Sequence, residues 1–241
     1  MTNPDHSSRW ASFQRANRFR RAIRNFGTRL VSQEDMTSLF AEAVFAPSSG
    51  NLQPYELHWI REPILKAGVA AACNGQRAAA TATELVVFVA NPAIGRQTAQ
   101  AQLAYMEASP MPDKSKIYYR QQIRKFQKIL GLGSSALWSP LLFLAALLRP
   151  GLSLLPIGHI GSRHWAARNA VFAAQTLILG AAAKGIDSCP MEGFSASKLI
   201  KLLGLPRGSV IPIVVALGYR AEDARLEQQW RRPVNEAVVS H

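Results

Sequence analysis

The residues best suited to hold a ligand stand together in one short stretch, Ala46 to Tyr55. This stretch, Ala-Pro-Ser-Ser-Gly-Asn-Leu-Gln-Pro-Tyr, packs two prolines, two serines, Gly, Asn and Gln into ten residues. Proline fixes φ, glycine allows positive φ, and Ser, Asn and Gln offer hydrogen bonds on short tethers. The stretch is either a plain helix-to-strand connector or a rigid loop that presents polar groups to a ligand, and its density of polar residues favours the second.

Arginine and lysine supply the other chemistry. The 241-residue chain has 28 Lys and Arg against 15 Asp and Glu, a formal net charge of +13. This balance predicts attraction to anions such as nucleotides, phospholipid surfaces or nucleic acid. The charge is uneven, because Asp113 is the only acid between Ala108 and Ile186, against ten Lys and Arg. The basic region carries no nucleic-acid recognition motif, so the sequence predicts no specific nucleic-acid partner.

Several familiar chemistries have no motif in this sequence. There is no GxGxxG, GxxxxGK[ST], GxSxG or HExxH pattern, which removes the commonest nucleotide, esterase and zinc-peptidase interpretations. Five histidines do not cluster and Cys73 and Cys189 are far apart, so we expect no metal site and two buried thiols in a reducing compartment. The arginine-rich N terminus lacks an apolar h-region, so it is no secretory signal. Its Arg and Ser content weakly resembles a transit peptide, but the arginine run leads directly into a motif of the folded body, and we expect a cytoplasmic location.

The hydrophobic pattern indicates a globular fold over residues 1–241, with residues 1–12 as a disordered lead. Hydrophobic residues make up 48% of the chain, enough for one full core. Leu85 to Ala90 is a continuous apolar run typical of a strand buried on both faces. Ser209 to Gly218 is a second such strand, in which Pro212 predicts an edge position or a bulge. Arg163 to Lys184 is apolar nearly all round, which predicts a central helix.

Residues 93–160 form the least orthodox part of the chain, a helical excursion. Its basic helix, expected over Lys114 to Leu130, carries a cationic stripe with a four-residue repeat: Lys116, Arg120, Arg124 and Lys128. The uncharged segment that follows is most hydrophobic over residues 136–148, a stretch too short to span a bilayer. It could pack in a core or a dimer, cover a site as a lid, or join a weak peripheral membrane contact through residues 114–148.

Four separated signals, taken in order, resemble the flavin-dependent nitroreductase family. The first is Arg-Arg-Ala-Ile-Arg-Asn-Phe at 20–26, close to that family's Arg-Arg-Ser-Ile-Arg-x-Phe. The second is the loop at 46–55, close to Ala-Pro-Ser-Ser-x-Asn-x-Gln-Pro-Trp. The third is Pro-Met-Glu-Gly-Phe at 190–194, close to Pro-Ile-Glu-Gly-Phe. The fourth is Gly218-Tyr219 with the Arg-Arg-Pro tail at 231–233.

The resemblance covers residues 20–90 and 163–237 and implies an α+β sandwich. In that fold a mostly antiparallel sheet of about four or five strands is flanked by helices, and an obligate homodimer holds two FMN molecules at the subunit interface. FMN needs a cationic phosphate site, and arginine contacts phosphate in a bidentate manner. The residues that match the family's cofactor contacts are Arg20, Arg21, Ala22, Arg24, Pro47, Ser48, Ser49, Asn51, Gln53, Gln76, Arg77, Pro190, Met191, Glu192, Gly193, Arg231 and Arg232.

The resemblance also assigns roles. Glu192 and Gly193 are the expected catalytic positions, on a turn whose backbone N–H would face flavin N5, the atom that accepts and returns hydride. The loop residues Ser48, Ser49 and Asn51 are expected to face the flavin of the other subunit. NAD(P)H would be the electron donor, and a small nitroaromatic or quinone the acceptor.

Three departures from the family pattern leave other interpretations open. Ala22 replaces the usual Ser, Gln229 stands where a Lys commonly joins the tail arginine, and residues 93–160 match nothing in the family. One alternative is a family offshoot with another flavin chemistry, such as dehalogenation or flavin fragmentation. Another is a basic flavin-binding or membrane-surface protein that is not an enzyme. The acceptor, and the choice between NADH and NADPH, do not follow from these residues.

Overall fold

A computed structural model describes residues 6–132, 144 and 161–241 of the chain. Its centre is a four-stranded sheet in the order β1-β2-β4-β3, in which every neighbouring pair is antiparallel. The register pairs Tyr55 with Ala90, Leu85 with Ala216 and Cys189 with Ala216 on its other side. The strands are β1 (Tyr55–Ile60), β2 (Glu84–Ala90), β3 (Asp187–Met191) and β4 (Val210–Gly218).

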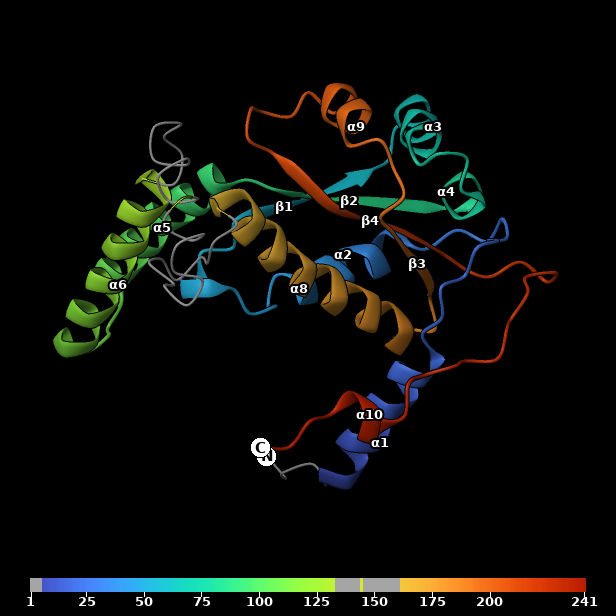
Figure 1. Cartoon of the computed structure of the whole chain (residues 1–241), viewed down its shortest axis with the longest axis horizontal. Helices are drawn as coiled ribbons and strands as arrows, with labels where there is room; N and C mark the ends of the chain where they lie inside the picture. The colour runs from blue at the N-terminus through green and yellow to red at the C-terminus, as the bar shows by residue number, and fades with distance from the viewer. Residues whose placement is uncertain (1–5, 133–143, 145–160) are drawn as a thin grey trace.

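The two central strands, β2 and β4, are covered on both faces. Alternate residues of β2 point to opposite sides: Val86 and Phe88 join one hydrophobic core, and Val87 and Val89 join the other. One core contains the long helix α8 (Gly161–Ala183) and α2 (Gln33–Ala43), and the other contains α3 (Pro63–Ala72), α4 (Arg77–Thr81) and α9 (Ala196–Leu202). The chain is therefore an α+β sandwich, as expected (Figure 1).

Helix α8 is the central helix that the sequence predicts. Eleven of its residues are buried, and most of these are alanines that let the helix lie close to the sheet and to α2. Helix α2 is capped by Ser32, whose hydroxyl accepts a hydrogen bond from the Asp35 N–H at 3.0 Å. A closing glycine, Gly185, follows α8 with φ of 71°.

Pro212 corrects one expectation about β4. The strand is not an edge strand, because it lies between β2 and β3. Its pairing with β2 shifts between Phe88 and Ala90, so Pro212 stands at an irregularity in the ladder, the bulge that the sequence offered as the alternative. The pairing of β4 with β3 ends at Val214. Pro212 lies beyond this pairing, so its missing N–H costs no hydrogen bond to β3.

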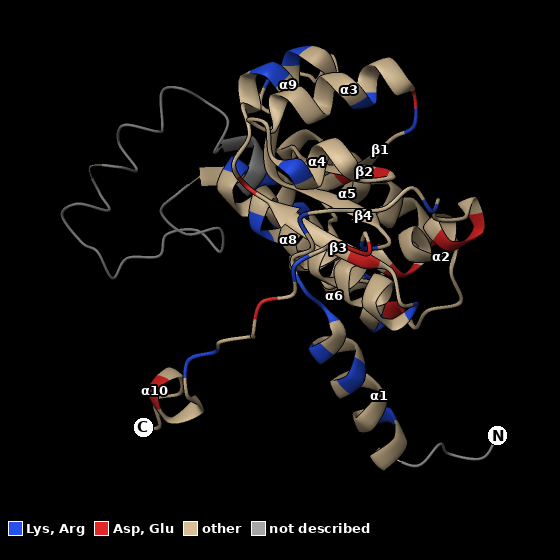
Figure 2. Cartoon of the chain, turned by 90° about the vertical axis from the view of Figure 1, so that its right-hand side faces the viewer, with Lys and Arg blue, Asp and Glu red and all other residues tan. Residues whose placement is uncertain are grey.

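The two ends of the described chain extend away from the sheet. Helix α1 (His6–Phe19) contains no buried residue, and the short helix α10 (Val234–Ala237) follows a long extended segment. Figure 2 shows both arms leaving the body, with the arginines of α1 along its exposed surface. The sequence predicts a disordered lead over residues 1–12, whereas α1 begins at His6 and contains no buried residue.

The excursion begins with two helices, α5 (Pro92–Ala108) and α6 (Asp113–Leu132), which pack against each other at the left of Figure 1. The buried side of α6 includes Ile123, and its Phe126 ring contacts the loop at Gly50. The apolar segment 136–148 falls outside the described residues except for Leu144. Among the described helices, none is long and apolar enough to cross a membrane.

Candidate functional site

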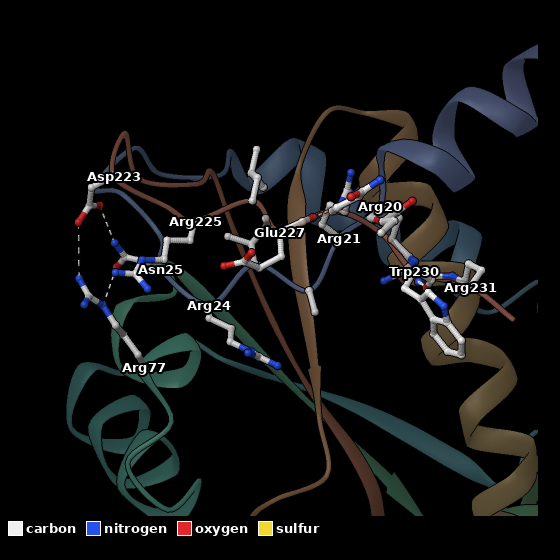
Figure 3. Close-up of a pocket in the computed structure, with 15 residues that line it drawn as sticks. Arg20, Arg21, Arg24, Asn25, Arg77, Asp223, Arg225, Glu227, Trp230 and Arg231 are labelled. Carbon is white, nitrogen blue, oxygen red and sulfur yellow. Dashed lines mark hydrogen bonds and ion pairs between the residues drawn. The ribbon is translucent and has the colours of Figure 1, made fainter.

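A cavity of about 760 Å³ lies between two segments that are distant in the sequence. Residues 20–25 form one wall, residues 225–231 form the other, and α4 adds Arg77 (Figure 3). The lining residues are Arg20, Arg21, Ala22, Ile23, Arg24, Asn25, Arg77, Asp223, Arg225, Leu226, Glu227, Gln228, Gln229, Trp230 and Arg231.

The first wall is fixed by the sheet. Ala22 forms a parallel bridge with Ser188 of β3, and the Ile23 N–H donates to the Ser188 carbonyl at 3.0 Å. Ile23 and Phe26 are buried in the core, so they hold the segment against the sheet. The three arginines between Arg20 and Arg24 are thereby left on the cavity side, which explains why a short motif can supply several cations to one site.

The second wall is tied to the first by two hydrogen bonds. The Gln229 amide donates to the Arg20 carbonyl at 3.1 Å, and the Arg21 guanidinium donates to the Glu227 carbonyl at 2.7 Å. In both bonds the acceptor is a main-chain carbonyl, so the tail is positioned without the use of a side-chain carboxylate. Gln229, a departure from the family pattern in the sequence, has a structural use here.

The cavity carries a strong excess of positive charge. Six arginines line it against two acids, Asp223 and Glu227. Burial lowers the pKa of Arg20, and the like charges of Arg231 and Arg21 lower it further, which means that three guanidinium groups repel one another at this end. An anion placed there would relieve both the repulsion and the desolvation. The charge at this end of the cavity is complementary to an anionic group such as a phosphate or a carboxylate.

The other end of the cavity holds a polar clamp. The Arg77 Nε donates to Asn25 Oδ1 at 3.0 Å, and Asn25 Nδ2 donates to Asp223 Oδ1 at 2.7 Å. Arg77 also lies 3.9 Å from the second Asp223 oxygen. The clamp joins the first wall, α4 and the start of the tail, so the single amide of Asn25 connects three segments (Figure 3).

A turn after β3 lies beside α4. The Gly193 carbonyl accepts hydrogen bonds from the Gln76 amide at 2.6 Å and from the Asn74 amide at 3.2 Å. A Cβ on Gly193 would lie 3.1 Å from Gln76 Nε2, so the residue must remain small for this approach. Among the contacts of the described residues, none uses the Gly193 N–H, which is therefore available to a ligand.

The loop at 46–55 does not line this cavity. It is braced internally, since Gln53 N–H donates to Ser48 Oγ at 3.0 Å and the Gln53 amide donates to Asn51 Oδ1 at 3.0 Å. It is also fixed to α8, where the buried Asn169 accepts from the Ser49 N–H at 2.8 Å. Asn51 and Gln53 have positive φ values of 55° and 40°, a conformation that the loop's many polar contacts hold in place.

The comparisons with known proteins decide the family. The model of the nitroreductase family matches residues 18–219. The chain belongs to the nitroreductase family. The match includes the first wall and the Gly193 turn, whereas the tail segment that closes the cavity lies after its end.

Two curated relatives span most of the chain. A protein named NADH dehydrogenase from Thermus thermophilus is 26% identical over 204 residues, which are 85% of this chain and 84% of the relative. A candidate NAD(P)H nitroreductase, MhqN of Bacillus subtilis, is 24% identical over 221 residues, 91% of this chain and 94% of the relative.

Solved structures share the fold. A candidate nitroreductase, YdfN of Bacillus subtilis, has a TM-score of 0.76 at 22% identity and covers 96% of this chain and 100% of its own. A candidate nitroreductase from Exiguobacterium sibiricum, solved in complex with FMN, has a TM-score of 0.72 at 19% identity and covers 100% and 99%. NADPH:FMN oxidoreductase from Vibrio harveyi, complexed with NAD⁺, has a TM-score of 0.62 at 18% identity and covers 95% and 76%.

The nitroreductase fold brings some of the predicted residues together and leaves others apart. Arg20, Arg21, Ala22, Arg24, Arg77 and Arg231 line the cavity. Gln76 binds the Gly193 turn, beside the exposed Glu192, while Met191 is buried and Pro190 half-buried in β3. Pro47, Ser48, Ser49, Asn51 and Gln53 lie in the separate loop. Arg232 lies outside the lining and donates to the Glu236 carbonyl of α10.

Sequence reasoning missed several lining residues. Asn25 was the variable position of its motif, and its clamp depends on two residues distant in the chain. Arg225 and Trp230 stand in a tail with no periodic pattern, so their only available signal was proximity to the Arg-Arg-Pro tripeptide. Asn169, which lies outside the lining, was also missed: it stands among alanines of α8, where a buried polar residue is the signal of a hydrogen-bond role.

Proposed function

We propose that this nitroreductase-family chain is an FMN-dependent oxidoreductase that takes hydride from NAD(P)H and reduces a small acceptor such as a nitroaromatic or a quinone. The observation that carries the proposal is the cavity with six arginines against two acids. The FMN-bound Exiguobacterium protein and the Vibrio NADPH:FMN oxidoreductase, which share this fold, support the choice of cofactor and donor. We also propose a reducing, cytoplasmic location, which the two free and buried cysteines support.

The residues present fit an FMN phosphate. Arg20, Arg21 and Arg231 concentrate positive charge at one end of the cavity, where burial, and then the like charges of Arg231 and Arg21, lower the pKa of Arg20. A dianionic phosphate group would balance that charge and accept bidentate hydrogen bonds. Ala22 and the half-buried edge of the first wall would face the rest of the ligand without adding charge.

FMN, when bound, supplies a ring that accepts hydride from reduced nicotinamide and passes the electrons to the acceptor. The chain's part is to bind, orient and polarise. The Gly193 N–H is a free donor on a turn held by Gln76 and Asn74, so it can hydrogen-bond a ring nitrogen or oxygen. Arg24 lines the arginine-rich cavity, whose lining does not include Gly193, and would stabilise negative charge that develops on the ring. No side chain is required as a nucleophile.

A second copy of the chain would complete the site. The loop residues Pro47, Ser48, Ser49 and Asn51 have ligand-binding character but lie outside the cavity of their own chain. Their loop is held to α8 by the hydrogen bond from the Ser49 N–H to Asn169, so its position is well defined for contact with a partner. We assign these residues to the flavin of the other subunit in a homodimer.

The absorption spectrum of the purified protein tests the cofactor, and steady-state assays test the reaction. We expect a yellow protein that releases FMN rather than FAD on denaturation. We also expect it to oxidise NADH or NADPH when a nitroaromatic or a quinone is supplied. A colourless protein that ignores added FMN would reject the cofactor assignment. A flavoprotein that oxidises neither donor with any such acceptor would instead favour another flavin chemistry.

A further inference from the structure

Helix α6 presents a cationic face that the proposed reaction does not use. Seven residues repeat at intervals of three or four along one side of the helix, and all are exposed. They are Lys114, Ile117, Tyr118, Gln121, Arg124, Lys125 and Lys128. From Lys114 to Lys128 this outer face extends roughly 20 Å, at about 1.5 Å per residue.

The opposite side of α6 explains why these residues face outward. Ile123 is buried, and Phe126 packs on Gly50 of the loop. Two cations of the predicted stripe are used within the α5–α6 pair: Lys116 donates to the Glu107 carbonyl at 3.2 Å, and Arg120 binds the Glu107 carboxylate. The predicted stripe is therefore divided, and Arg124 and Lys128 belong to the outer face.

Among the described residues, no acidic side chain pairs with the cations of the outer face. Lys114, Arg124, Lys125 and Lys128 make no ion pair or side-chain hydrogen bond within the described part of the chain. The only acid of α6 is Asp113, at its first residue. Four cations on one exposed helix side, without local acids, have charge complementarity to a surface of dense negative charge.

Two further residues select the kind of surface. Ile117 is 50% exposed and Tyr118 is 57% exposed, in the middle of the cationic row. An apolar side chain and a tyrosine beside lysines suit the boundary between lipid headgroups and acyl chains, where apolar atoms enter and ammonium groups remain in water. Nucleic acid would use the cations but would give Ile117 no apolar environment. Figure 1 also places α6 at the opposite end of the molecule from α4 and β3, so a surface bound there lies away from the arginine-rich cavity of the same chain.

We infer that the outer face of α6 docks the protein on anionic phospholipid. The contact is peripheral: the cations lie at the headgroups, and Ile117 and Tyr118 enter the boundary below them. Each cation near an anionic leaflet strengthens binding by about fivefold. Three cations therefore contribute about a hundredfold to the vesicle partition coefficient, and the contribution falls as salt screens it.

Sedimentation of the full-length protein with sucrose-loaded vesicles tests the inference. We expect pelleting with phosphatidylcholine vesicles that contain phosphatidylglycerol, loss of pelleting at high salt, and none with phosphatidylcholine alone. The variant R124Q/K125Q/K128Q should bind about a hundredfold less. The matched control K198Q/K201Q/R207Q removes three exposed cations elsewhere and lowers the net charge from +13 to +10 in the same way. It should bind nearly as well as the unchanged protein.

The alternatives appear as separate outcomes. Failure of the unchanged protein to pellet with anionic vesicles at low salt would overturn the inference, and so would equal losses in the two triple variants. Binding of single-stranded RNA through Arg124, Lys125 and Lys128 without vesicle binding would assign the face to nucleic acid instead. A change of mass in light scattering for R124Q/K125Q/K128Q would assign it to a second copy. Equal thermal unfolding midpoints of the unchanged protein and the two triple variants would establish that a loss of binding is not a loss of folding.

Discussion

At the scale of single residues, the cavity depends on like charges held close together. Arg20 is the centre of this arrangement, because it is partly buried, lies near Arg21 and Arg231, and has a carbonyl bound by Gln229. Holding six arginines around a cavity with only two acids in its lining costs stability in the ligand-free chain. That cost is returned when an anion enters, so affinity for the anion should be sensitive to Arg20 in particular.

We expect Arg20→Ala to weaken FMN binding by about 1.5–3 kcal/mol, the contribution of a hydrogen bond to a charged group. This corresponds to a dissociation constant roughly ten- to 150-fold larger, measured by flavin fluorescence titration of the cofactor-free protein. The matched control is Arg232→Ala, which removes the same charge from a residue outside the cavity. Equal weakening by both variants would mean that only the net charge acts.

At the scale of elements, one buried ion pair fixes both walls of the cavity. Asp187 begins β3 and is almost fully buried, and it accepts from the Arg220 N–H at 2.9 Å and from Arg220 Nε at 2.9 Å. Hydrogen bonding to Asp187 raises the pKa of Arg220. Its neighbour Ser188 binds the first wall, while Arg220 starts the tail and stacks over Phe19 at the end of α1. The pair thus connects β3, β4 and both arms.

We expect Asp187→Asn to lower the free energy of unfolding by about 2–4 kcal/mol, because it leaves a half-buried guanidinium without its charge partner. Urea unfolding followed by circular dichroism measures this change as a lower midpoint at constant slope. Lys184→Gln serves as the control, since it breaks the exposed Lys184–Asp35 pair and should barely move the midpoint. An unchanged urea midpoint in Asp187→Asn would show that the Asp187–Arg220 pair does not hold the walls of the cavity in place.

The elements also show what the sequence could predict. Leu85 to Ala90 and the helix from Arg163 were predictable because burial imposes a local pattern, and Ser32 because a helix cap is local. The position of β4 inside the sheet was not, since it depends on pairing with β2 and β3 rather than on Pro212. In the same way, the arginine motif predicted the first wall, but the Asn25 clamp required contacts across about 200 residues of chain.

At the scale of the whole molecule, apolar side chains remain exposed on several elements, among them α1, α8 and the tail. Helix α1 exposes the stacked pair Trp10 and Phe13, α8 exposes Phe172, and the tail exposes Val238. A helix without any buried residue, such as α1, gains little stability from its own chain. Exposed apolar groups on arms that leave the body favour a partner that receives them, in agreement with the proposed homodimer.

We expect light scattering to give the mass of a dimer, and Phe172→Ser to weaken dimerisation about tenfold or more, the effect of losing a central apolar contact. FMN affinity should fall with it, because the partner's loop is part of the proposed site. Ile64→Ser is the control: Ile64 is 82% exposed on α3, in the other layer of the sandwich, and should leave the dimer intact. A monomer that binds FMN fully would disprove the shared site.

The tie between Arg20 and Gln229 also orders events during biosynthesis. The ribosome makes the arginine-rich wall early, whereas the segment that closes the cavity follows β4 and is made after every described strand. The sheet can therefore assemble around a cluster of repelling guanidinium groups before the closing segment has emerged. Acquisition of the ligand becomes one of the last steps of maturation. A chain clipped after Arg220 would keep all four strands of the sheet and the Asp187–Arg220 pair but would lose the closing wall, so proteolysis of the tail there would yield a folded protein unable to retain its anion.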